Sequence, residues 1–326
     1  MPSLVSVLLP VYNGEKYLRG AIESVLAQEY PRFEFVIADN ASSDGTAEII
    51  DSFSGDPRVR VIRSRETVSR LENFNRVFAA ASKESNWYKF VGDDDRLLPN
   101  CLDELVRAGE SGDKAGLVCS YYYNGEKLVT GALPAGVSFI EGPQILKKML
   151  LEPEARSTIF SPASLLIRPQ VFWELGPFRT DLLHADAELF YRILNSCNLA
   201  CAHQPLVKIG FHADSGQALS EITGHTFAEA YLIRYHNLKR YDKVKLTRLE
   251  VERIKNNLVL DSTGYMLARC LKGDFRAALK HLRAIPAAAL HHLPLGLCYF
   301  ILLFFKKLFR GEPVRLLRGR RRGRVT

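Results

Sequence analysis

Three consecutive carboxylates, Asp93, Asp94 and Asp95, give this sequence its clearest potential for chemistry. They follow an apolar run, Trp87 to Val91, whose length and composition predict a β-strand. Like charges gathered at one strand end repel each other, so the arrangement is costly unless a cation is present. Carboxylate oxygens suit Mg²⁺ and Mn²⁺, ions that commonly bridge phosphates. A solvated turn is the alternative for an isolated acidic run, but the position after a strand favours a divalent metal site.

The end of the first predicted strand carries a candidate group for binding a nucleotide base. This strand covers Leu4 to Leu9 and continues into Pro10, Val11 and Tyr12. Proline lacks the N–H that a central strand donates, and the aromatic ring that follows is suited to stacking on a base. A structural proline beside a packed tyrosine is the alternative interpretation.

A second aspartate site, Asp39, ends the next predicted strand, Phe33 to Asp39. Its carboxylate is suited to accept a hydrogen bond from the imide N–H of uracil, or from the corresponding edge of guanine. Its alternative role is to cap the helix that is expected to begin near Thr46.

The elements that position these residues alternate along the first 120 residues. Short apolar runs are separated by amphipathic stretches, an order typical of βαβ units with a largely parallel sheet. The expected strands are Leu4–Leu9, Phe33–Asp39, Val59–Ile62 and Trp87–Val91, and the expected helices are residues 18–26, a helix from Thr46, and Leu71–Ala81. Ligands of open α/β sheets bind beyond the carboxyl ends of the strands, so Asp39 and the acidic run should share one edge.

The rest of the chain is expected to add a second half to the same sheet and then a helical extension. Strands are expected at Gly116–Tyr123 and Ala163–Ile167, and helices at Gln144–Leu151 and Asp186–Asn195. Beyond Ser220 the sequence favours helices. The predicted organisation is a domain of residues 1–220 with halves 1–115 and 116–220, a helical extension 221–285, and a terminal segment 286–326.

The formal net charge of +8 comes from the end of the chain. Residues 306–326 contain nine basic residues and one acidic residue, so the preceding part is neutral overall. A neutral body argues against a nucleic-acid-binding face. The basic tail follows an uncharged stretch, residues 287–305, in which Pro294 and Gly296 favour an interfacial or re-entrant membrane helix over a full span. Basic residues beside an apolar helix indicate an anionic membrane surface.

The cysteines and the amino terminus indicate the compartment. Six cysteines are scattered without a CxxC pair, and no signal peptide precedes the first strand-like run. These features predict a reducing, cytoplasmic setting. Together with the terminal segment, they predict a protein associated peripherally with the inner face of the membrane.

Three ordered runs resemble the family 2 glycosyltransferases. They are VSVLLPVYNGEKYLRGAIESVLAQ, FEFVIADNASSDGT and FVGDDDRLLPN, and the resemblance covers roughly residues 3–220, with the amino-terminal half the more specific. It implies a GT-A fold, a mixed sheet flanked by helices, with inversion at the anomeric carbon. It makes residues 1–115 the nucleotide-sugar half and residues 116–220 the acceptor half. The residues that it places at the nucleotide sugar are Pro10, Val11, Tyr12, Asp39, Arg70, Asp93 and Asp94.

The acidic run departs from the family pattern. Many members have Asp-x-Asp-Asp, and this chain has Gly92 at the first of those positions. The metal is expected to be held by Asp95 and Asp93, or by Asp95 alone while Asp94 faces the ribose. Asp95 is the leading ligand in both cases, and whether Asp93 or Asp94 assists it stays open. His212, which follows a strand-like run, matches a family histidine near the metal or diphosphate, although a structural histidine is the alternative.

The catalytic base is expected at Asp186. The run HADAELFYR resembles the family's Glu-Asp-x-Asp pattern with Ala185 in place of the glutamate, and it follows an acceptor-side run, Ser164 to Phe178. A carboxylate there would take the proton from an acceptor hydroxyl. A first-turn acid that stabilises its own helix is the alternative, and the two roles are compatible.

The resemblance implies sugar transfer from a nucleotide-diphosphate donor, with a UDP-sugar favoured, and with Mn²⁺ or Mg²⁺ as cofactor. The expected acceptor is a hydroxyl group, with a lipid-linked glycan of surface polysaccharide synthesis as the preferred case. A metal-dependent nucleotidyltransferase is the alternative enzyme, but Pro10 to Gly14 is not the Gly-rich loop that it would bring. A non-catalytic GT-A scaffold is the remaining alternative, and the retained aspartates argue against it.

Overall fold

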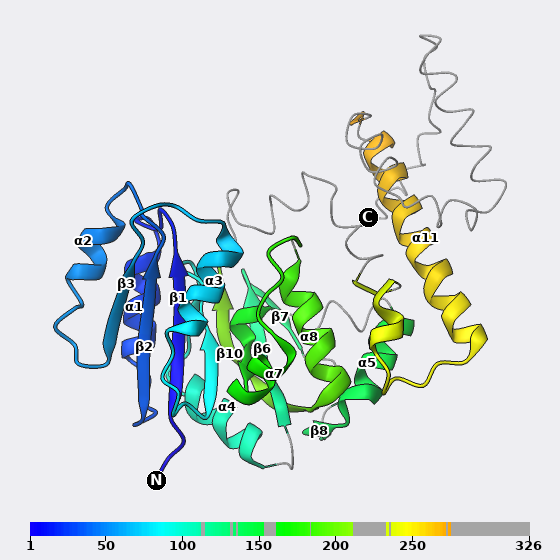
Figure 1. The fold of residues 1–326 in the computed structure, drawn as a ribbon, viewed down its shortest axis with the longest axis horizontal. Coiled ribbons are helices and arrows are strands. Elements are labelled where there is room, and N and C mark those ends of the chain that lie inside the picture. Colours follow the sequence, from blue (N-terminus) through cyan, green and yellow to red (C-terminus); the bar gives the residue numbers. More distant parts are fainter. Residues whose placement is uncertain are drawn as a thin grey trace, which may run out of the picture.

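The computed structural model describes residues 1–111, 115–130, 133–134, 136–152, 161–182, 184–210, 233–234, 236–271 and 273–274. Figure 1 shows a central sheet with helices on both of its faces, and a long helix that extends away from it. The predicted α/β class with a mixed sheet is therefore confirmed.

Within the described residues, ten strands form one sheet. Their order is β3 (Val59–Arg63), β2 (Phe33–Asp39), β1 (Val5–Val11), β4 (Trp87–Phe90), β9 (Leu165–Ile167), β6 (Ala115–Asn124), β10 (Asn198–Ile209) and β5 (Arg96–Leu97), while β7 (Lys127–Val129) pairs with β6 and β8 (Phe139–Ile140) pairs with β10. β1 is parallel to β2 and β4, and β9 is antiparallel to both β4 and β6. Because β10 is parallel to β6, the carboxyl ends of β1, β2, β4, β6 and β10 lie at the same edge, here called the carboxyl edge.

The amino-terminal half follows the predicted alternation closely. Its helices are α1 (Leu18–Leu26), α2 (Thr46–Asp51), α3 (Arg70–Ala79) and α4 (Cys101–Glu110), of which α4 was not among the expected elements. The Ser69 side chain accepts the backbone N–H of Glu72, and the Glu72 carboxylate accepts that of Ser69. This capping box fixes the start of α3 at the carboxyl edge.

The second half completes the sheet and adds helices to one face. These elements are α5 (Gly142–Leu151), the 3₁₀ helix η1 (Pro162–Ser164), α7 (Pro169–Leu175) and α8 (Ala185–Ser196). Further along lie the 3₁₀ helix η2 (His236–Arg240) and the long helix α11 (Arg248–Leu271). Ile254 of α11 is buried, and the Asn257 amide donates to the Leu151 carbonyl at 2.9 Å, so α11 packs on α5. In the described parts, the helical character expected beyond Ser220 is confirmed.

Alternating side chains of the central strands supply two cores. Leu8 and Val36 belong to the core under α3, α5, α7 and α8, whereas Leu9 and Ile37 belong to the core under α1 and α4. Successive residues of a strand point to opposite faces, so strands covered on both faces must be apolar throughout. Each of these four side chains is 0% exposed.

No helix in the described part of the chain combines the length and the apolar composition needed to cross a bilayer. The uncharged stretch at 287–305 lies outside the described residues.

Candidate active site

Two loops at the carboxyl edge are joined by hydrogen bonds. The backbone N–H of Ser43 donates to Asn13 Oδ1 at 2.8 Å, and the N–H of Asn13 donates to Ser42 Oγ at 3.0 Å. The N–H of Gly14 donates to Thr46 Oγ1 at 2.8 Å. Asn13 has a φ of 52°, a left-handed conformation that asparagine tolerates better than most residues. The loops after β1 and β2 therefore form one connected surface.

The predicted base-binding residues meet at this surface. Val11 pairs with Asp39 across β1 and β2, and Pro10 pairs with Ala38. Tyr12 follows directly and is 51% exposed, so its ring is accessible. Asp39 is 5% exposed, and its Oδ1 accepts the N–H of Ser42 at 3.1 Å. Within the described part of the chain, Asp39 makes no second side-chain hydrogen bond, which leaves Oδ2 available to a ligand.

Two buried asparagines, which were not predicted as site residues, hold this end of β2 against α3 and the loop before it. The Asn40 amide bonds both backbone groups of Val68, donating to the carbonyl at 2.8 Å and accepting the N–H at 2.9 Å. Asn73 Nδ2 donates to the Ala38 carbonyl at 3.0 Å. In a sequence, such residues can be recognised as asparagines at strand ends or on apolar helix faces. A buried amide there needs hydrogen-bond partners, so it joins neighbouring segments.

The predicted phosphate-side residue, Arg70, is exposed at the first position of α3. Its guanidinium lies 5.6 Å from the centre of the Phe74 ring. The start of α3 lies at the carboxyl edge, so the structure places Arg70 at the edge predicted for the nucleotide.

Asp95 is the most buried member of the acidic run, with 6% of its surface exposed. Its Oδ2 accepts the N–H of Gly92 at 2.8 Å, and its Oδ1 accepts the N–H of Gly210 at 3.2 Å. Burial, followed by the neighbouring Asp94 carboxylate, raises the pKa of Asp95 to about 6, although the two backbone bonds and Lys89 act in the opposite direction. Asp95 thus fastens the acidic loop to the end of β10.

Asp93 and Asp94 are partly exposed and lie beside two glycines. A Cβ added to Gly14 would lie 2.6 Å from Asp93 Oδ2, and one added to Gly210 would lie 2.5 Å from Asp94 Oδ2. Only glycine leaves room for these carboxylates, so Asp93 faces the loop after β1 and Asp94 faces the end of β10. Neither glycine was predicted from the sequence to be part of the site.

The oxygen donors of this loop fit Mg²⁺ or Mn²⁺ in chemical type. Mg²⁺ is commonly bound through one or two carboxylates together with substrate phosphates. Within the described residues, no group of three His, Cys, Asp or Glu side chains lies close enough together to bind a metal ion. Both oxygens of Asp95 accept backbone N–H groups, whereas Asp93 and Asp94 are the more exposed carboxylates of the loop. The predicted ligand His212 lies outside the described residues.

A fully buried lysine lies behind the acidic loop and was missed in the sequence because it interrupts an apolar run. Lys89 is 0% exposed, and its Nζ donates to the carbonyls of Phe90, at 3.1 Å, and Ala163. Burial lowers the pKa of Lys89, while nearby Cys101 and Asp95 oppose that shift. The ammonium group therefore ties the end of β4 to η1.

The predicted catalytic base, Asp186, is the second residue of α8, and its side chain is partly exposed. Its Oδ1 accepts the backbone N–H of Ala187 at 2.8 Å. Only Cys197 separates the end of α8 from the start of β10, so the helix runs back along the strand. The start of α8 therefore points to the carboxyl edge, where Asp39 and the acidic loop also lie (Figure 1).

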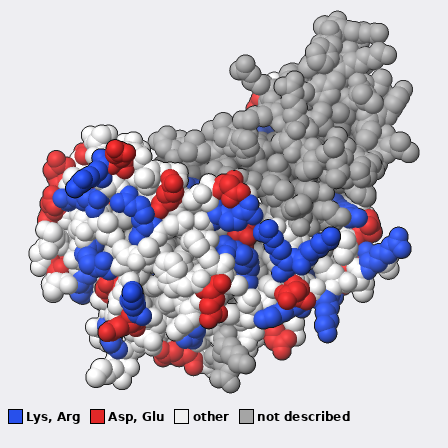
Figure 2. Space-filling model, in the orientation of Figure 1, with Lys and Arg blue, Asp and Glu red and all other residues white. Residues whose placement is uncertain are grey.

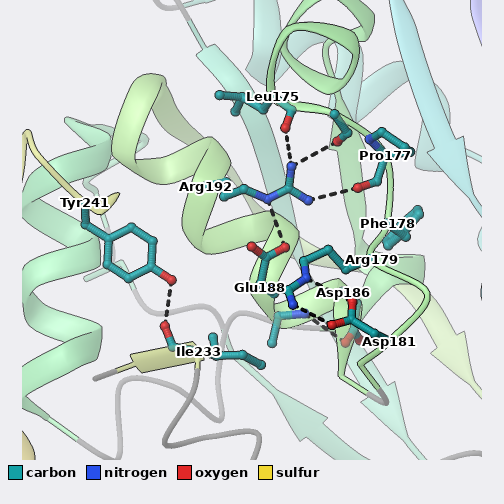
Figure 3. Close-up of polar contacts among 12 residues, drawn as sticks. Leu175, Pro177, Phe178, Arg179, Asp181, Asp186, Glu188, Arg192, Ile233 and Tyr241 are labelled. Atoms are coloured by element: carbon teal, nitrogen blue, oxygen red, sulfur yellow. Dashed lines mark hydrogen bonds and ion pairs between the residues drawn. The ribbon is translucent and has the colours of Figure 1, made fainter. Parts of the chain in front are cut away.

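An arginine on the same helix fixes its position (Figure 3). Arg192 Nε donates to Glu188 Oε2 at 2.9 Å, and Glu188 is 1% exposed. The two terminal nitrogens of Arg192 donate to the carbonyls of Leu175, Gly176, at 3.1 Å, and Pro177, at 2.9 Å. The guanidinium thus joins α8 to the turn after α7.

The same turn is also fastened to α3, in the amino-terminal half of the chain. Asn75 of α3 donates from Nδ2 to the Phe178 carbonyl at 2.9 Å, and its Oδ1 accepts the Phe178 N–H at 2.9 Å. Two side chains, Asn75 and Arg192, therefore connect α3, the turn and α8.

The amino-terminal half of the chain matches a known protein family. Residues 6–176, just over half of the chain, match the family model described as glycosyl transferase family 2. The chain belongs to this family. The resemblance stated from the sequence motifs is thereby confirmed.

Several curated relatives of this chain carry glycosyltransferase names. Glycosyltransferase GlyG of Streptococcus pneumoniae serotype 4 is 33% identical over 125 residues, which are 38% of this chain and 40% of that protein. An uncharacterized glycosyltransferase of Rickettsia felis is 28% identical over 228 residues, 68% of this chain and 36% of that protein. The putative teichuronic acid biosynthesis glycosyltransferase TuaG of Bacillus subtilis is 30% identical over 104 residues, 32% of this chain and 40% of that protein. The chain thus spans about two fifths of the length of these relatives.

Solved structures share the fold. Residues 1–349 of S. aureus TarS, in complex with UDP-GlcNAc, align with a TM-score of 0.64 at 15% identity, covering 96% of this chain and 93% of that chain. The mannosyltransferase PcManGT of Pyrobaculum calidifontis, in complex with GDP-Man and Mn²⁺, aligns with a TM-score of 0.55 at 16% identity, covering 96% and 89%. These similarities confirm the GT-A fold.

Proposed function

We propose that this family 2 glycosyltransferase inverts the anomeric carbon while it moves a sugar from a UDP-sugar to a hydroxyl acceptor. The observation that carries the proposal is the meeting of three sets of carboxylates at the carboxyl edge. Asp39 arrives on β2, the acidic loop follows β4, and Asp186 begins α8. Base recognition, diphosphate binding and proton removal each need one of these groups.

The nucleotide lies across the ends of β1 and β2 in this proposal. The accessible Tyr12 ring packs on the base, and the Oδ2 atom of Asp39 accepts the imide N–H of uracil. Pro10 and Val11 shape the strand end, and Arg70 at the start of α3 approaches the phosphates. TarS with UDP-GlcNAc and PcManGT with GDP-Man support a nucleotide sugar as the donor class.

The diphosphate lies against the acidic loop. Asp94 and Asp93 would hold Mn²⁺ or Mg²⁺ there, with Asp95 as the buried anchor beneath them and His212 as a further candidate ligand. The bound ion would neutralise the charge that develops on the departing diphosphate. This proposed order differs from the sequence-based prediction, which puts Asp95 first and stays a prediction.

Asp186 acts as the general base. It takes the proton of the acceptor hydroxyl while that oxygen forms a bond to C1 of the sugar and the bond from C1 to the diphosphate oxygen breaks. One displacement of this kind inverts C1 and needs no covalent enzyme intermediate. The Asp186 carboxylate is partly exposed, so an acceptor can reach it.

A lipid-linked glycan at the cytoplasmic face of a membrane is the acceptor that we propose. TuaG, named for teichuronic acid biosynthesis, supports a surface polysaccharide. In the described part of the chain, Leu249 of α11 is 83% exposed. Exposed basic residues precede it along the chain, namely Lys239, Arg240, Lys243, Lys245 and Arg248, with Asp242 as an exposed acid among them. Figure 2 shows basic side chains, interspersed with acidic ones, at the end of the molecule where α5 and α11 begin. An exposed leucine among cations suits an anionic lipid surface.

A thermal-shift screen of UDP- and GDP-sugars, with and without Mn²⁺, tests the proposal. A ligand that binds only the native state raises the melting temperature by mass action. We expect a UDP-sugar to raise it, and to raise it further when Mn²⁺ is present. If neither UDP-sugars nor GDP-sugars shift the melting temperature, with or without Mn²⁺, the proposed donor site is wrong.

A further inference from the structure

A surface groove lies away from the carboxyl edge. It has a volume of about 610 Å³ and is bounded by the end of α3, the residues that lead into β4, and α7. Tyr88, the second residue of β4, lines it together with Trp173 of α7. Because β4 runs from this groove toward the acidic loop, the groove lies at the end of β4 opposite to the candidate active site.

Trp173 presents a fixed aromatic surface to the groove. Its side chain is 48% exposed, whereas Trp87, the other tryptophan of the chain, is 1% exposed. The indole Nε1 donates to the Tyr88 hydroxyl at 3.1 Å, and the Phe172 ring meets the indole edge-on with 5.0 Å between ring centres. Exposed tryptophan leaves a large apolar area in water, which binding of a ligand would remove.

The polar lining of the groove is balanced in charge. Lys83, Gln170 and Glu174 line it, and all three side chains are exposed. Within the described residues, none of these three makes a side-chain hydrogen bond or ion pair. Their ammonium, amide and carboxylate groups supply both donors and acceptors, and the charges of Lys83 and Glu174 cancel. This balance favours a neutral polar ligand over a nucleotide or another anion.

We propose that this groove binds a neutral saccharide unit and does not take part in catalysis. A sugar ring combines an apolar C–H face, which packs on the Trp173 indole, with hydroxyl groups that bond Gln170, Glu174 and Lys83. Small-molecule sites pair an apolar surface with a few polar groups in the same way. In a glycosyltransferase, such a groove would hold a second part of a glycan while the donor occupies the carboxyl edge. The binding is measurable without sugar transfer, so it is tested independently of the proposed reaction.

Tryptophan fluorescence of the full chain provides the first measurement. Maltotetraose, chitotetraose and mannotetraose are titrated separately, because Trp173 is the only exposed one of two tryptophans. We expect a saturable change for at least one of them, with a Kd of about 1 mM or below. Saturation-transfer NMR of the same sugar then measures binding to variants that lack the indole.

The variants separate the groove from the rest of the surface. Trp173→Ala should weaken binding of the sugar at least about tenfold, and Glu174→Ala should weaken it to a lesser degree. Glu126→Ala, at an exposed acid of the turn between β6 and β7, is the matched control and should bind normally. The thermal shift by a UDP-sugar should persist in Trp173→Ala, which shows that the fold and the donor site are intact.

Three outcomes would overturn the proposal. One is the absence of saturable binding for all three sugars at concentrations of about 10 mM. Another is equal binding by Trp173→Ala, which would place the sugar elsewhere. The third is concentration-dependent dimerisation that Trp173→Ala abolishes, which would assign the groove to a second copy of the chain.

Discussion

Arg192 and Glu188 form an ion pair one helical turn apart on α8, with 2.9 Å between Nε and Oε2. The pair is largely removed from solvent, since the exposed fractions of the side chains are 18% for Arg192 and 1% for Glu188. The guanidinium also satisfies the carbonyls of the turn that follows α7. The first turn of this helix carries Asp186, so the ion pair helps to position the proposed base.

Arg192→Met should lower the free energy of unfolding by about 3 kcal/mol, because it leaves the buried Glu188 carboxylate without its partner. Urea denaturation measures this difference. The matched control is Arg179→Met, which breaks the pair with Asp181, whose side chain is 64% exposed, and which should cost less than about 1 kcal/mol. Equal losses in the two variants would contradict the structural role of Arg192. Arg192→Lys should recover little of the lost stability, because one ammonium group cannot donate to Glu188 and to the carbonyls of the turn as the planar guanidinium does.

Asp186→Asn should leave donor binding unchanged and reduce sugar transfer by about 10² to 10⁴-fold, since the amide cannot take up the acceptor proton. Steady-state kinetics with the identified acceptor, together with the donor thermal shift, separates the two effects. Asp181→Asn, at an exposed carboxylate of the preceding turn, is the control and should retain transfer. Normal transfer by Asp186→Asn would move the base to another residue.

Asp94→Asn should mainly affect metal binding, whereas Asp95→Asn should mainly affect stability. Asp94→Asn should raise the Mn²⁺ concentration needed for half-maximal turnover without a large change in stability, because its carboxylate is partly exposed. Asp95→Asn should lower the free energy of unfolding by about 1 to 3 kcal/mol, since an amide cannot accept from both Gly92 and Gly210. Turnover as a function of Mn²⁺, measured alongside urea denaturation, distinguishes them. The reverse pattern would restore Asp95 as the leading ligand.

Asp39→Ala should weaken UDP binding about tenfold, because it removes the acceptor for the imide N–H of uracil. Isothermal titration of UDP measures the change. Asp51→Ala, which removes an exposed carboxylate paired with Arg63, is the control and should bind UDP normally. Unchanged UDP affinity in Asp39→Ala would leave Asp39 with only its bond to the N–H of Ser42.

The local part of the fold was predictable from the sequence. β2 spans Phe33 to Asp39 as predicted, because a mostly apolar run, with Glu34 as its one charged residue before Asp39, is buried on both faces. β10 was foreseen only as a strand-like run, since Pro205 and shifts in register near it disturb the pattern. The helix α4 was not foreseen either.

The candidate site was predictable in its residue types but not in its contacts. The acidic run was found from its position after a strand, whereas the bond from Gly210 to Asp95 joins residues 115 positions apart. The role of Lys89 depends on the Ala163 carbonyl of a distant segment, so no local pattern marks it. Sequence spacing identifies groups at strand ends, and tertiary contacts decide which carboxylate is buried and which faces a ligand.

Membrane association should depend on two parts of the chain in different ways. The full chain is expected to sediment with vesicles that contain anionic phosphatidylglycerol, and deletion of residues 287–326 should release most of it, because that segment combines the uncharged stretch with the basic tail. Replacing Lys239, Lys243 and Lys245 by Gln in the full chain should weaken binding by a smaller amount that vanishes at high salt. Lys127→Gln, on exposed β7, is the matched control. Full retention on vesicles after the deletion would place the anchor elsewhere, since the terminal charge and the apolar stretch are then both absent.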